Sequence, residues 1–427
     1  MSIDTYNLMN KDNLILQFNI NTGEIISKES ESKLPYYLSR LINNYDGDPD
    51  GEMPIISWIK SRIRFYCLPT SATRFLYMNI YRCMSLAEVI DKFHCISMND
   101  TFWVKRADQQ NLTWNNISPY QNIHSKLIST YALNCGETNI KEIDSSLSPV
   151  PSTRGSYPHT WKQVPSHSNG GTVELRHIFV KASSKYRFES DGEDNRNYIE
   201  PYSEYIASQI GQYLGFYSLE YKLKQRTFTI GANKYIDTVT ECECYTTEEI
   251  GSVAAKDLGL NTYEKVIEFC KESKKEWDLN TCLDMLFLDC LLINPDRHFR
   301  NIEFLMNNTS LEVIGIVPIF DNNKAFSMLK YANIENKENW EKEINQIRKN
   351  YRAYDRKRLR ELFTLVCSYK SYEEELKKLK EFKLSLGKLG EEWISAEQQE
   401  FINFFLQNQI RYLLRIDRKT KRQGNRE

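Results

Sequence analysis

Apolar residues recur along this chain at two spacings, and each spacing predicts one kind of secondary structure. Spacings of three and four residues predict packed helices, and they are clearest in the C-terminal half, over residues 279–291, 359–366 and 401–414. Short apolar runs between turn residues predict strands, here over residues 14–18, 173–181, 219–229 and 235–245. The pattern therefore predicts an α+β protein whose C-terminal half is mainly helical.

Turn and cap signals divide these elements. The turns Asn-Thr-Gly at 21–23 and Gly-Ala-Asn at 231–233 each separate two predicted strands, so both predict hairpins. Ser-Leu-Ala-Glu at 85–88 has the form of a capping box and predicts the start of a helix. Serine and proline punctuate residues 137–165, which we interpret as a linker or a wrapping arm.

Composition is that of a globular protein. Of the 427 residues, 41% are hydrophobic and 26% charged, and a net charge of −1 gives no overall nucleic-acid footprint. Ten cysteines without a Cys-x-x-Cys pair argue against a structural zinc site and against a disulfide scaffold. The N-terminus has no signal-peptide pattern, and the richest apolar run, 285–293, is too short to span a bilayer. We therefore expect a soluble, cytoplasmic protein of two or three domains that does not engage a membrane.

Candidate chemistry lies in residues 291–326, where an apolar helical run ends at a proline turn. Asp296 follows the turn, Asn301 comes five residues later, and Asp321 ends the second of two short predicted strands. Phosphoryl transfer from a nucleotide uses one carboxylate to hold the acceptor, and a second carboxylate with an amide oxygen to hold Mg²⁺. Because Mg²⁺ prefers oxygen ligands and keeps several waters, one Asp and one Asn suffice. These residues predict a kinase.

The motif Asp-Arg-His-x-x-Asn at 296–301, followed by Phe-Asp at 320–321, resembles the active site of HipA-like kinases. These are bacterial serine/threonine kinases whose fold is related to the phosphoinositide 3-kinase group. The resemblance implies a two-lobed kinase fold, with Asp296 as the catalytic aspartate, Asn301 as a metal ligand and Asp321 as the principal metal ligand. After Asp321 the chain departs from the better-known protein kinases, because Asn-Asn stands in place of Phe-Gly.

A lysine and a glutamate upstream complete the set. Lys181 ends an apolar strand that follows residues 166–172, a loop containing Gly170 and Gly171. Glycines let backbone amides approach phosphates closely, so we expect this loop over the phosphates of ATP and Lys181 beside them. Glu204 lies on a predicted helix that starts near a proline, and we expect it to pair with Lys181.

The strand after the second hairpin is placed to cross from one lobe of a kinase to the other. There we expect the backbone of Glu243 and Cys244 to contact the adenine of ATP. The expected organisation is an N-terminal accessory domain over 1–150, a small lobe over 151–247 and a helical large lobe over 248–427, which carries the catalytic loop.

The resemblance extends to two further segments. Residues 96–105 contain Ser-x-x-Asp-x-aromatic-Trp-x-Lys and are similar to the extra N-terminal region of longer HipA-like proteins; we interpret them as structural. Related kinases phosphorylate a serine in the loop equivalent to 166–172, which implies autophosphorylation at Ser166 or Ser168.

Together these residues predict an ATP- and Mg²⁺-dependent serine/threonine protein kinase that acts on a protein substrate of unknown identity. A lipid or small-molecule kinase is one alternative, because phosphoinositide kinases share the Asp-Arg-His-x-x-Asn motif. A nucleotide-binding pseudokinase scaffold is another, which the completeness of the residue set opposes. A third is a regulator associated with nucleic acid through its N-terminal region, suggested only by toxin–antitoxin pairs in the family. Nucleic acid is not the expected partner.

Overall fold

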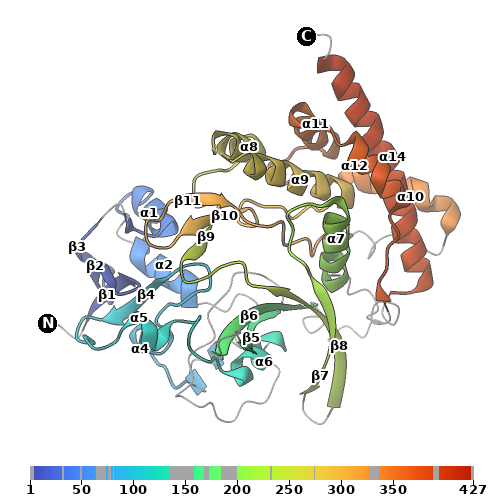
Figure 1. Ribbon diagram of the computed structural model, residues 1–427. Coiled ribbons are helices and arrows are strands. Elements are labelled where there is room, and N and C mark those ends of the chain that lie inside the picture. The colour runs from blue at the N-terminus through green and yellow to red at the C-terminus, as the bar shows by residue number, and fades with distance from the viewer. Residues whose placement is uncertain are drawn as a thin grey trace.

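A computed structural model describes residues 4–30, 33–48, 51–63, 74–75, 78–79, 81–134, 136, 158–167, 173–183, 200–230, 233–273, 275–326, 336–387 and 394–424. Within these residues the chain forms helices and three sheets with antiparallel pairing, which confirms the predicted α+β class (Figure 1). The limits predicted for the three domains stay predictions.

The first sheet, in the order β3-β2-β1-β4, belongs to the N-terminal part of the chain. Its strands are β1 (Thr5–Asn10), β2 (Asn13–Asn19), β3 (Ile25–Lys28) and β4 (Phe102–Arg106). The helices of this part are α1 (Tyr36–Asn43), α2 (Pro54–Ile63), α4 (Leu86–Phe93), α5 (Trp114–Ile117) and α6 (Lys126–Leu133). The predicted turn with Gly23 at φ 72° joins β2 to β3, and Ser85 caps α4 as predicted.

The second sheet, in the order β5-β6-β8-β7, contains the lysine strand. Its strands are β5 (His159–His167), β6 (Val173–Ala182), β7 (Lys222–Ile230) and β8 (Asn233–Glu243), and α7 (Glu200–Leu214) packs against the last three. β7 and β8 form the predicted hairpin. The linker predicted over 137–165 is wrong from His159 onward, because β5 pairs along its whole length with β6 and places the centroid of the Trp161 ring 4.9 Å from that of Phe179, at an interplanar angle of 48°.

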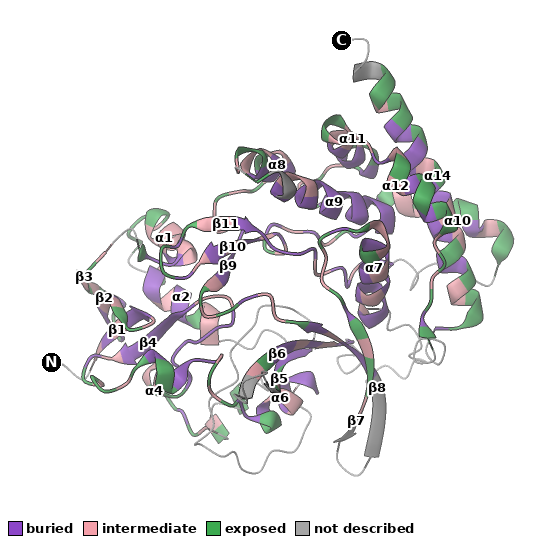
Figure 2. Cartoon of the chain, in the orientation of Figure 1, coloured by how far each residue is buried: buried purple, intermediate pink, exposed green. Residues whose placement is uncertain are grey.

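The third sheet, in the order β11-β10-β9, lies next to the helices of the C-terminal part. Its strands are β9 (Ile250–Ala254), β10 (Glu303–Asn307) and β11 (Val313–Ile316). The helices are α8 (Tyr263–Glu272), α9 (Glu276–Leu292), α10 (Trp340–Asn350), α11 (Leu359–Tyr369), α12 (Glu373–Lys378) and α14 (Ala396–Gly424). Residues 281–292 of α9 are all buried, which explains their nearly unbroken apolar sequence (Figure 2).

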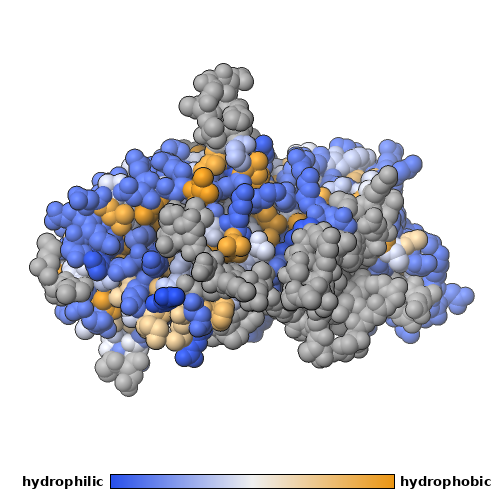
Figure 3. Space-filling view, turned by 90° about the horizontal axis from the view of Figure 1, so that it is seen from below, coloured by the Kyte–Doolittle hydropathy of each residue, from blue (hydrophilic) through white to orange (hydrophobic). Residues whose placement is uncertain are grey.

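The described helices include none that is both long and apolar enough to cross a bilayer. On the face drawn in Figure 3, hydrophilic residues cover most of the described surface and hydrophobic residues appear in small groups.

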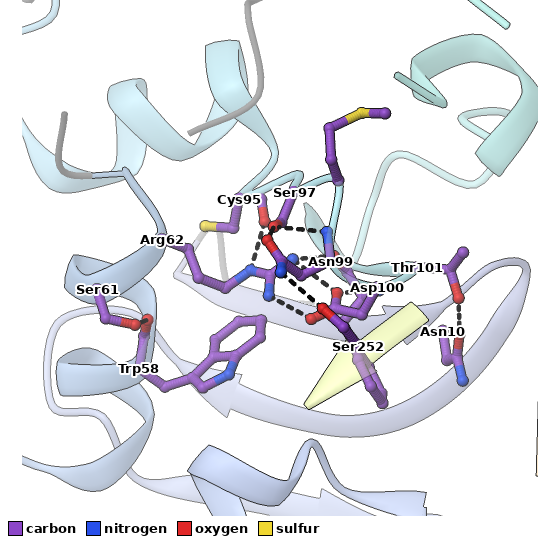
Figure 4. A network of polar contacts seen from close by, with 12 residues as sticks. Asn10, Trp58, Ser61, Arg62, Cys95, Ser97, Asn99, Asp100, Thr101 and Ser252 are labelled. Atoms are coloured by element: carbon purple, nitrogen blue, oxygen red, sulfur yellow. Dashed lines mark hydrogen bonds and ion pairs between the residues drawn. The ribbon is translucent and has the colours of Figure 1, made fainter. Parts of the chain in front are cut away.

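The N-terminal part contacts the third sheet through residues 96–101 (Figure 4). The carbonyl oxygen of Asn99 accepts the Ser252 N–H at 2.6 Å, and Asn99 Nδ2 donates to Ser252 Oγ at 2.8 Å. Arg62 holds this loop, because its guanidinium donates twice to Asp100, at 2.8 Å each, and lies over the ring of Trp58. The segment that we interpret as structural thus joins the first sheet to β9.

The same part of the chain also contacts the second sheet and the segment that follows β8. On β6, the ring of His177 lies with Nε2 at 2.9 Å from Pro119 O. Beyond β8, the carboxylate of Glu248 accepts three hydrogen bonds of 2.6 to 2.7 Å from Trp114, Ser118 and Gln121. The N-terminal part therefore contacts the second and the third sheet, and also residues 244–249, the segment between β8 and β9.

Candidate active site

Lys181, near the end of β6, brings three of the predicted residues together. Its ammonium donates to Glu204 Oε1 of α7 at 2.7 Å and to Asp321 Oδ1 at 2.5 Å. Glu204 is fully buried, whereas the side chains of Lys181 and Asp321 keep 14% and 16% of their surface exposed. The pairing of Lys181 with Glu204, predicted from the sequence, is present, and it joins a strand, a helix and a distant loop.

Asp321 comes from the chain that follows β11. On one side of it, Phe320 O accepts from Arg297 Nη1 at 2.6 Å; on the other, the Asn322 N–H donates to Glu204 Oε2 at 2.7 Å. Asp321 itself has φ 58°, a left-handed conformation that few residues other than Gly, Asn and Asp adopt. The two flanking hydrogen bonds hold this conformation and direct the carboxylate toward Lys181.

Asp296 and Asn301 lie on one compact loop. α9 ends with Ile293 in a left-handed conformation, at φ 50°, and the chain then turns. Within the turn the His298 N–H donates to Asp296 O at 2.8 Å, and Asn301 Nδ2 donates to the same oxygen at 3.2 Å. Both candidate side chains keep part of their surface exposed. This hydrogen bond fixes the side chain of Asn301, whose amide oxygen is the atom that can bind a cation.

Arg297, which is not among the site residues predicted from the sequence, ties this loop to Asp321. Its guanidinium is buried and donates to both carboxylate oxygens of Asp289, at 2.9 and 3.1 Å. It also donates to the carbonyl oxygens of Asn301 and Phe320 and to Asn322 Oδ1. One signal was available: Asp289 interrupts the richest apolar run, and a carboxylate buried in such a helix needs a partner.

Burial and neighbouring charges set the protonation of the site. Burial disfavours the ammonium, but the carboxylates of Asp321 and Glu204 outweigh it and raise the pKa of Lys181. Burial also opposes the ionisation of Asp321, but Lys181 outweighs it and lowers the pKa of Asp321. For Asp296, burial raises the pKa, and the negative charge of Asp321 raises it further. Asp321 is therefore the more acidic of the two carboxyl groups.

The oxygen atoms at this site suit Mg²⁺. The Asp321 carboxylate and the Asn301 amide are hard ligands, and Mg²⁺ completes its octahedron with waters and nucleotide phosphates. Among the described residues, no group of three His, Cys, Asp or Glu side chains could hold a metal ion alone. The Asp321 carboxylate and the Asn301 amide oxygen are the groups at this site that would hold a Mg²⁺ ion.

The segment expected to contact adenine is the end of β8. There β6 and β8 pair Ile178 with Glu243, and the Cys244 N–H donates to His177 O at 2.9 Å. Neighbouring residues of an antiparallel ladder turn their backbone groups to opposite sides, so Glu243 N–H and C=O point away from β6. The Cys244 N–H is engaged within the sheet, and contact of the Cys244 backbone with adenine stays a prediction. Contact of Glu243 with adenine stays a prediction.

Gly170 and Gly171 lie outside the described residues, as do Ser168 and the side chain of Ser166, whereas the strands before and after them are described. β5 and β6 pair His167 with Val173 beside the turn, and His159 with Lys181 at the other end. Eight steps along β6 (181 minus 173) span about 26 Å at roughly 3.3 Å per residue.

The expected position of this glycine loop over the phosphates of ATP stays a prediction. The chain beside Lys181 is Pro158, whose carbonyl oxygen accepts the Ala182 N–H at 2.8 Å. Autophosphorylation at Ser166 or Ser168 stays a prediction.

Comparison with known proteins adds a likeness in fold. No protein-family model matches the sequence, and no curated protein matches it significantly. Among solved structures, the chain is similar to HipA of Shewanella oneidensis MR-1, solved with HipB and operator DNA as a toxin–antitoxin system. That identity is 12% and the TM-score 0.45, over 96% of this chain and 97% of that chain. It is also similar to the proinflammatory kinase CtkA of Helicobacter pylori, at 16% identity and a TM-score of 0.38, over 62% of this chain and 91% of that chain.

These neighbours are HipA-like kinases. At such identities and TM-scores, however, the activity of this protein has to be judged from its own residues.

Proposed function

We propose that this protein is an ATP- and Mg²⁺-dependent serine/threonine protein kinase. The observation that supports this most strongly is the position of Lys181, whose ammonium binds Glu204 and Asp321 at 2.7 and 2.5 Å. A lysine held in this way has a fixed charge and a fixed direction, which is what binding of nucleotide phosphates requires. Arg297 connects Asp321 to the loop that presents Asp296 and Asn301.

Each residue then has a role in phosphoryl transfer. Lys181 binds the α- and β-phosphates, while Asp321 and Asn301 hold Mg²⁺, which neutralises charge on the transferring group. Asp296 orients the acceptor hydroxyl and accepts its proton. Because the transition state is loose, positioning and charge neutralisation contribute more to the rate than the basicity of Asp296. The backbone of Glu243 contacts adenine.

The experiment that tests this proposal separates nucleotide binding from transfer. Calorimetry with a slowly hydrolysed ATP analogue and Mg²⁺ measures binding, and labelled ATP with a cell lysate as acceptor measures transfer. Asp321→Asn is expected to abolish transfer and to weaken binding by at least about tenfold, or 1.4 kcal/mol. Asp296→Asn is expected to abolish transfer and to leave binding unchanged, because it contacts the acceptor.

Equal loss of binding in both variants would contradict these roles. A wild-type protein that binds the analogue but transfers no phosphate to any protein would favour the pseudokinase scaffold.

A further inference from the structure

The loop that carries Asp296 and Asn301 also presents a cation whose role is unassigned. Arg300 lies between these residues and is exposed. Its backbone N–H donates to His298 Nδ1 at 3.3 Å, which fixes the local conformation. Within the described part of the chain, no carboxylate forms an ion pair with its guanidinium. Its charge is therefore available on the loop that would hold the acceptor.

A second cation, Lys256, lies beside Arg300, and Arg40 lies beside Lys256. Lys256 follows β9, and its N–H donates to Phe299 O at 2.8 Å; its own carbonyl oxygen accepts from Arg40 Nη1 at 3.2 Å. Burial lowers the pKa of Lys256, and the positive charges of Arg300 and Arg40 lower it further, whereas Asp257 opposes this. The Asp257 carboxylate forms an ion pair with Arg40, with Nη2 at 3.0 Å from Oδ1. Positive charge thus gathers on one side of the catalytic loop.

An exposed aromatic ring borders the same loop. Tyr354 is 56% exposed, and its centroid lies 5.6 Å from that of His298 and 5.9 Å from that of Phe299. The acidic residue next to it, Asp355, is engaged by Lys357 at 2.7 Å. Tyrosine and arginine are enriched at recognition surfaces, because they combine apolar contact with directed hydrogen bonds.

We propose that Arg300, Lys256 and Tyr354 form an acceptor-docking surface that selects serine or threonine residues flanked by acidic residues in a polypeptide. This proposal rests on the proposed function. Since Arg300 shares one compact loop with Asp296, an acceptor hydroxyl bound at Asp296 brings its neighbouring residues close to the guanidinium. Complementary charges there favour encounter and binding, and like charges disfavour both.

The docking surface would position the acceptor for transfer of the γ-phosphate. A bond forms between the acceptor oxygen and the γ-phosphorus of ATP, while the bond from that phosphorus to the bridging oxygen of ADP breaks. The hydroxyl proton passes to Asp296. The docking surface itself does not enter the chemistry, so it is expected to change the KM for the acceptor more than kcat.

The test uses three serine peptides of equal length, flanked by Glu, by Gln or by Lys, with Mg²⁺-ATP. The wild type is expected to use the Glu peptide with a kcat/KM at least about tenfold above that of the Lys peptide, mainly through KM. Arg300→Glu combined with Lys256→Glu is expected to reverse this order. Lys342→Glu, which reverses one positive charge at an exposed position of α10, is the control and keeps the wild-type order. Affinity for the ATP analogue stays the same in all variants.

Equal kcat/KM for the three peptides in the wild type would overturn this inference and leave the kinase proposal standing. Transfer to no peptide and to no protein of a lysate would overturn both. A single-stranded oligonucleotide that binds through Arg300 and Lys256, with no effect of peptide charge on transfer, would identify nucleic acid as the partner and also overturn the inference.

Discussion

At the scale of single residues, the two carboxylates on Lys181 differ in how much they depend on it. Glu204 is fully buried and has one oxygen on Lys181 and the other on the Asn322 N–H. Asp321 is partly exposed and is the group expected to meet a metal ion. If ATP and Mg²⁺ bind as we propose, Asp321 would hold the metal, while Glu204 would keep Lys181 in place.

Lys181→Met is therefore expected to cost both stability and nucleotide binding. Removal of one partner from a buried pair leaves an uncompensated charge and costs on the order of 3–5 kcal/mol. Lys181→Met combined with Glu204→Gln should recover part of that stability but none of the binding. Urea denaturation and calorimetry measure the two effects. The control is Lys162→Met on neighbouring β5, where the pair with Glu241 is exposed and is worth about 1 kcal/mol or less. Equal destabilisation by the two lysine substitutions would contradict this reasoning.

The pKa of Asp296 leads to a prediction for the pH dependence of transfer. Burial raises this pKa, and the carboxyl group must be ionised to accept the proton of the acceptor. As the pH falls through the raised pKa, Asp296 takes up a proton and kcat declines, at a higher pH than the value of about 3.9 of an ordinary Asp. Because Lys181 lowers the pKa of Asp321, binding of the ATP analogue should persist over the same range. If kcat declined only at or below the pKa of an ordinary Asp, or if binding of the ATP analogue were lost over the same pH range, the role proposed for Asp296 would be contradicted.

At the scale of elements, the sequence was informative wherever a pattern is local. The apolar spacing predicts α9, the strand ending near Lys181 and the β7–β8 hairpin, and the structure has all three. The pairing of β5 with β6 depends on contacts between distant residues, and the composition before Trp161 resembles a linker. For that reason the pattern along the sequence predicts β6 but not β5. Arg297 was missed in the same way, since its partners lie up to 25 residues away.

Arg297 connects Asp289 of α9 to the loop that carries Asp321, and its planar guanidinium leads to a prediction. Arg297 donates to both oxygens of Asp289 and also to Phe320 O. Arg297→Lys keeps the charge but cannot reproduce this planar set of donors. The expected result is a loss of roughly 1–3 kcal/mol for unpaired buried acceptors. We also expect a fall in transfer of at least about tenfold, because Asp321 loses its support. Urea denaturation and labelled-ATP assays check both, and unchanged transfer would show that Asp321 does not depend on Arg297.

At the scale of the whole molecule, the N-terminal part of the chain lies beside both the second and the third sheet (Figure 1). Asn99 bonds to Ser252 on β9, Asn10 Nδ2 donates to Asn308 O at 2.7 Å after β10, and His177 on β6 contacts Pro119 O. Between these contacts lies the segment after β8, which connects the two sheets. The N-terminal part therefore spans the connection and is expected to limit movement of one sheet against the other.

Glu248 is the residue at which this restraint can be tested. Burial opposes its ionisation, but hydrogen bonds from Ser118, Gln121 and Trp114 lower the pKa of Glu248, so a charged carboxylate holds these three donors. Glu248→Gln keeps the shape but replaces one acceptor oxygen with a donor, and should cost about 1–3 kcal/mol. Glu249→Gln, at the next and more exposed position, is the matched control and should cost less than about 0.5 kcal/mol.

If the N-terminal part restrains the connection, loosening it has an effect beyond stability. Hydrogen–deuterium exchange over residues 243–249 should become faster in Glu248→Gln, because the segment opens more often. Affinity for the ATP analogue should weaken several-fold. The Glu243 backbone, which we propose contacts adenine, would then occupy several conformations, and binding would have to order it. Glu249→Gln should leave both measurements unchanged. Loss of stability in Glu248→Gln without faster exchange or weaker binding would mean that the N-terminal part supports the fold but does not restrain the segment between the two sheets.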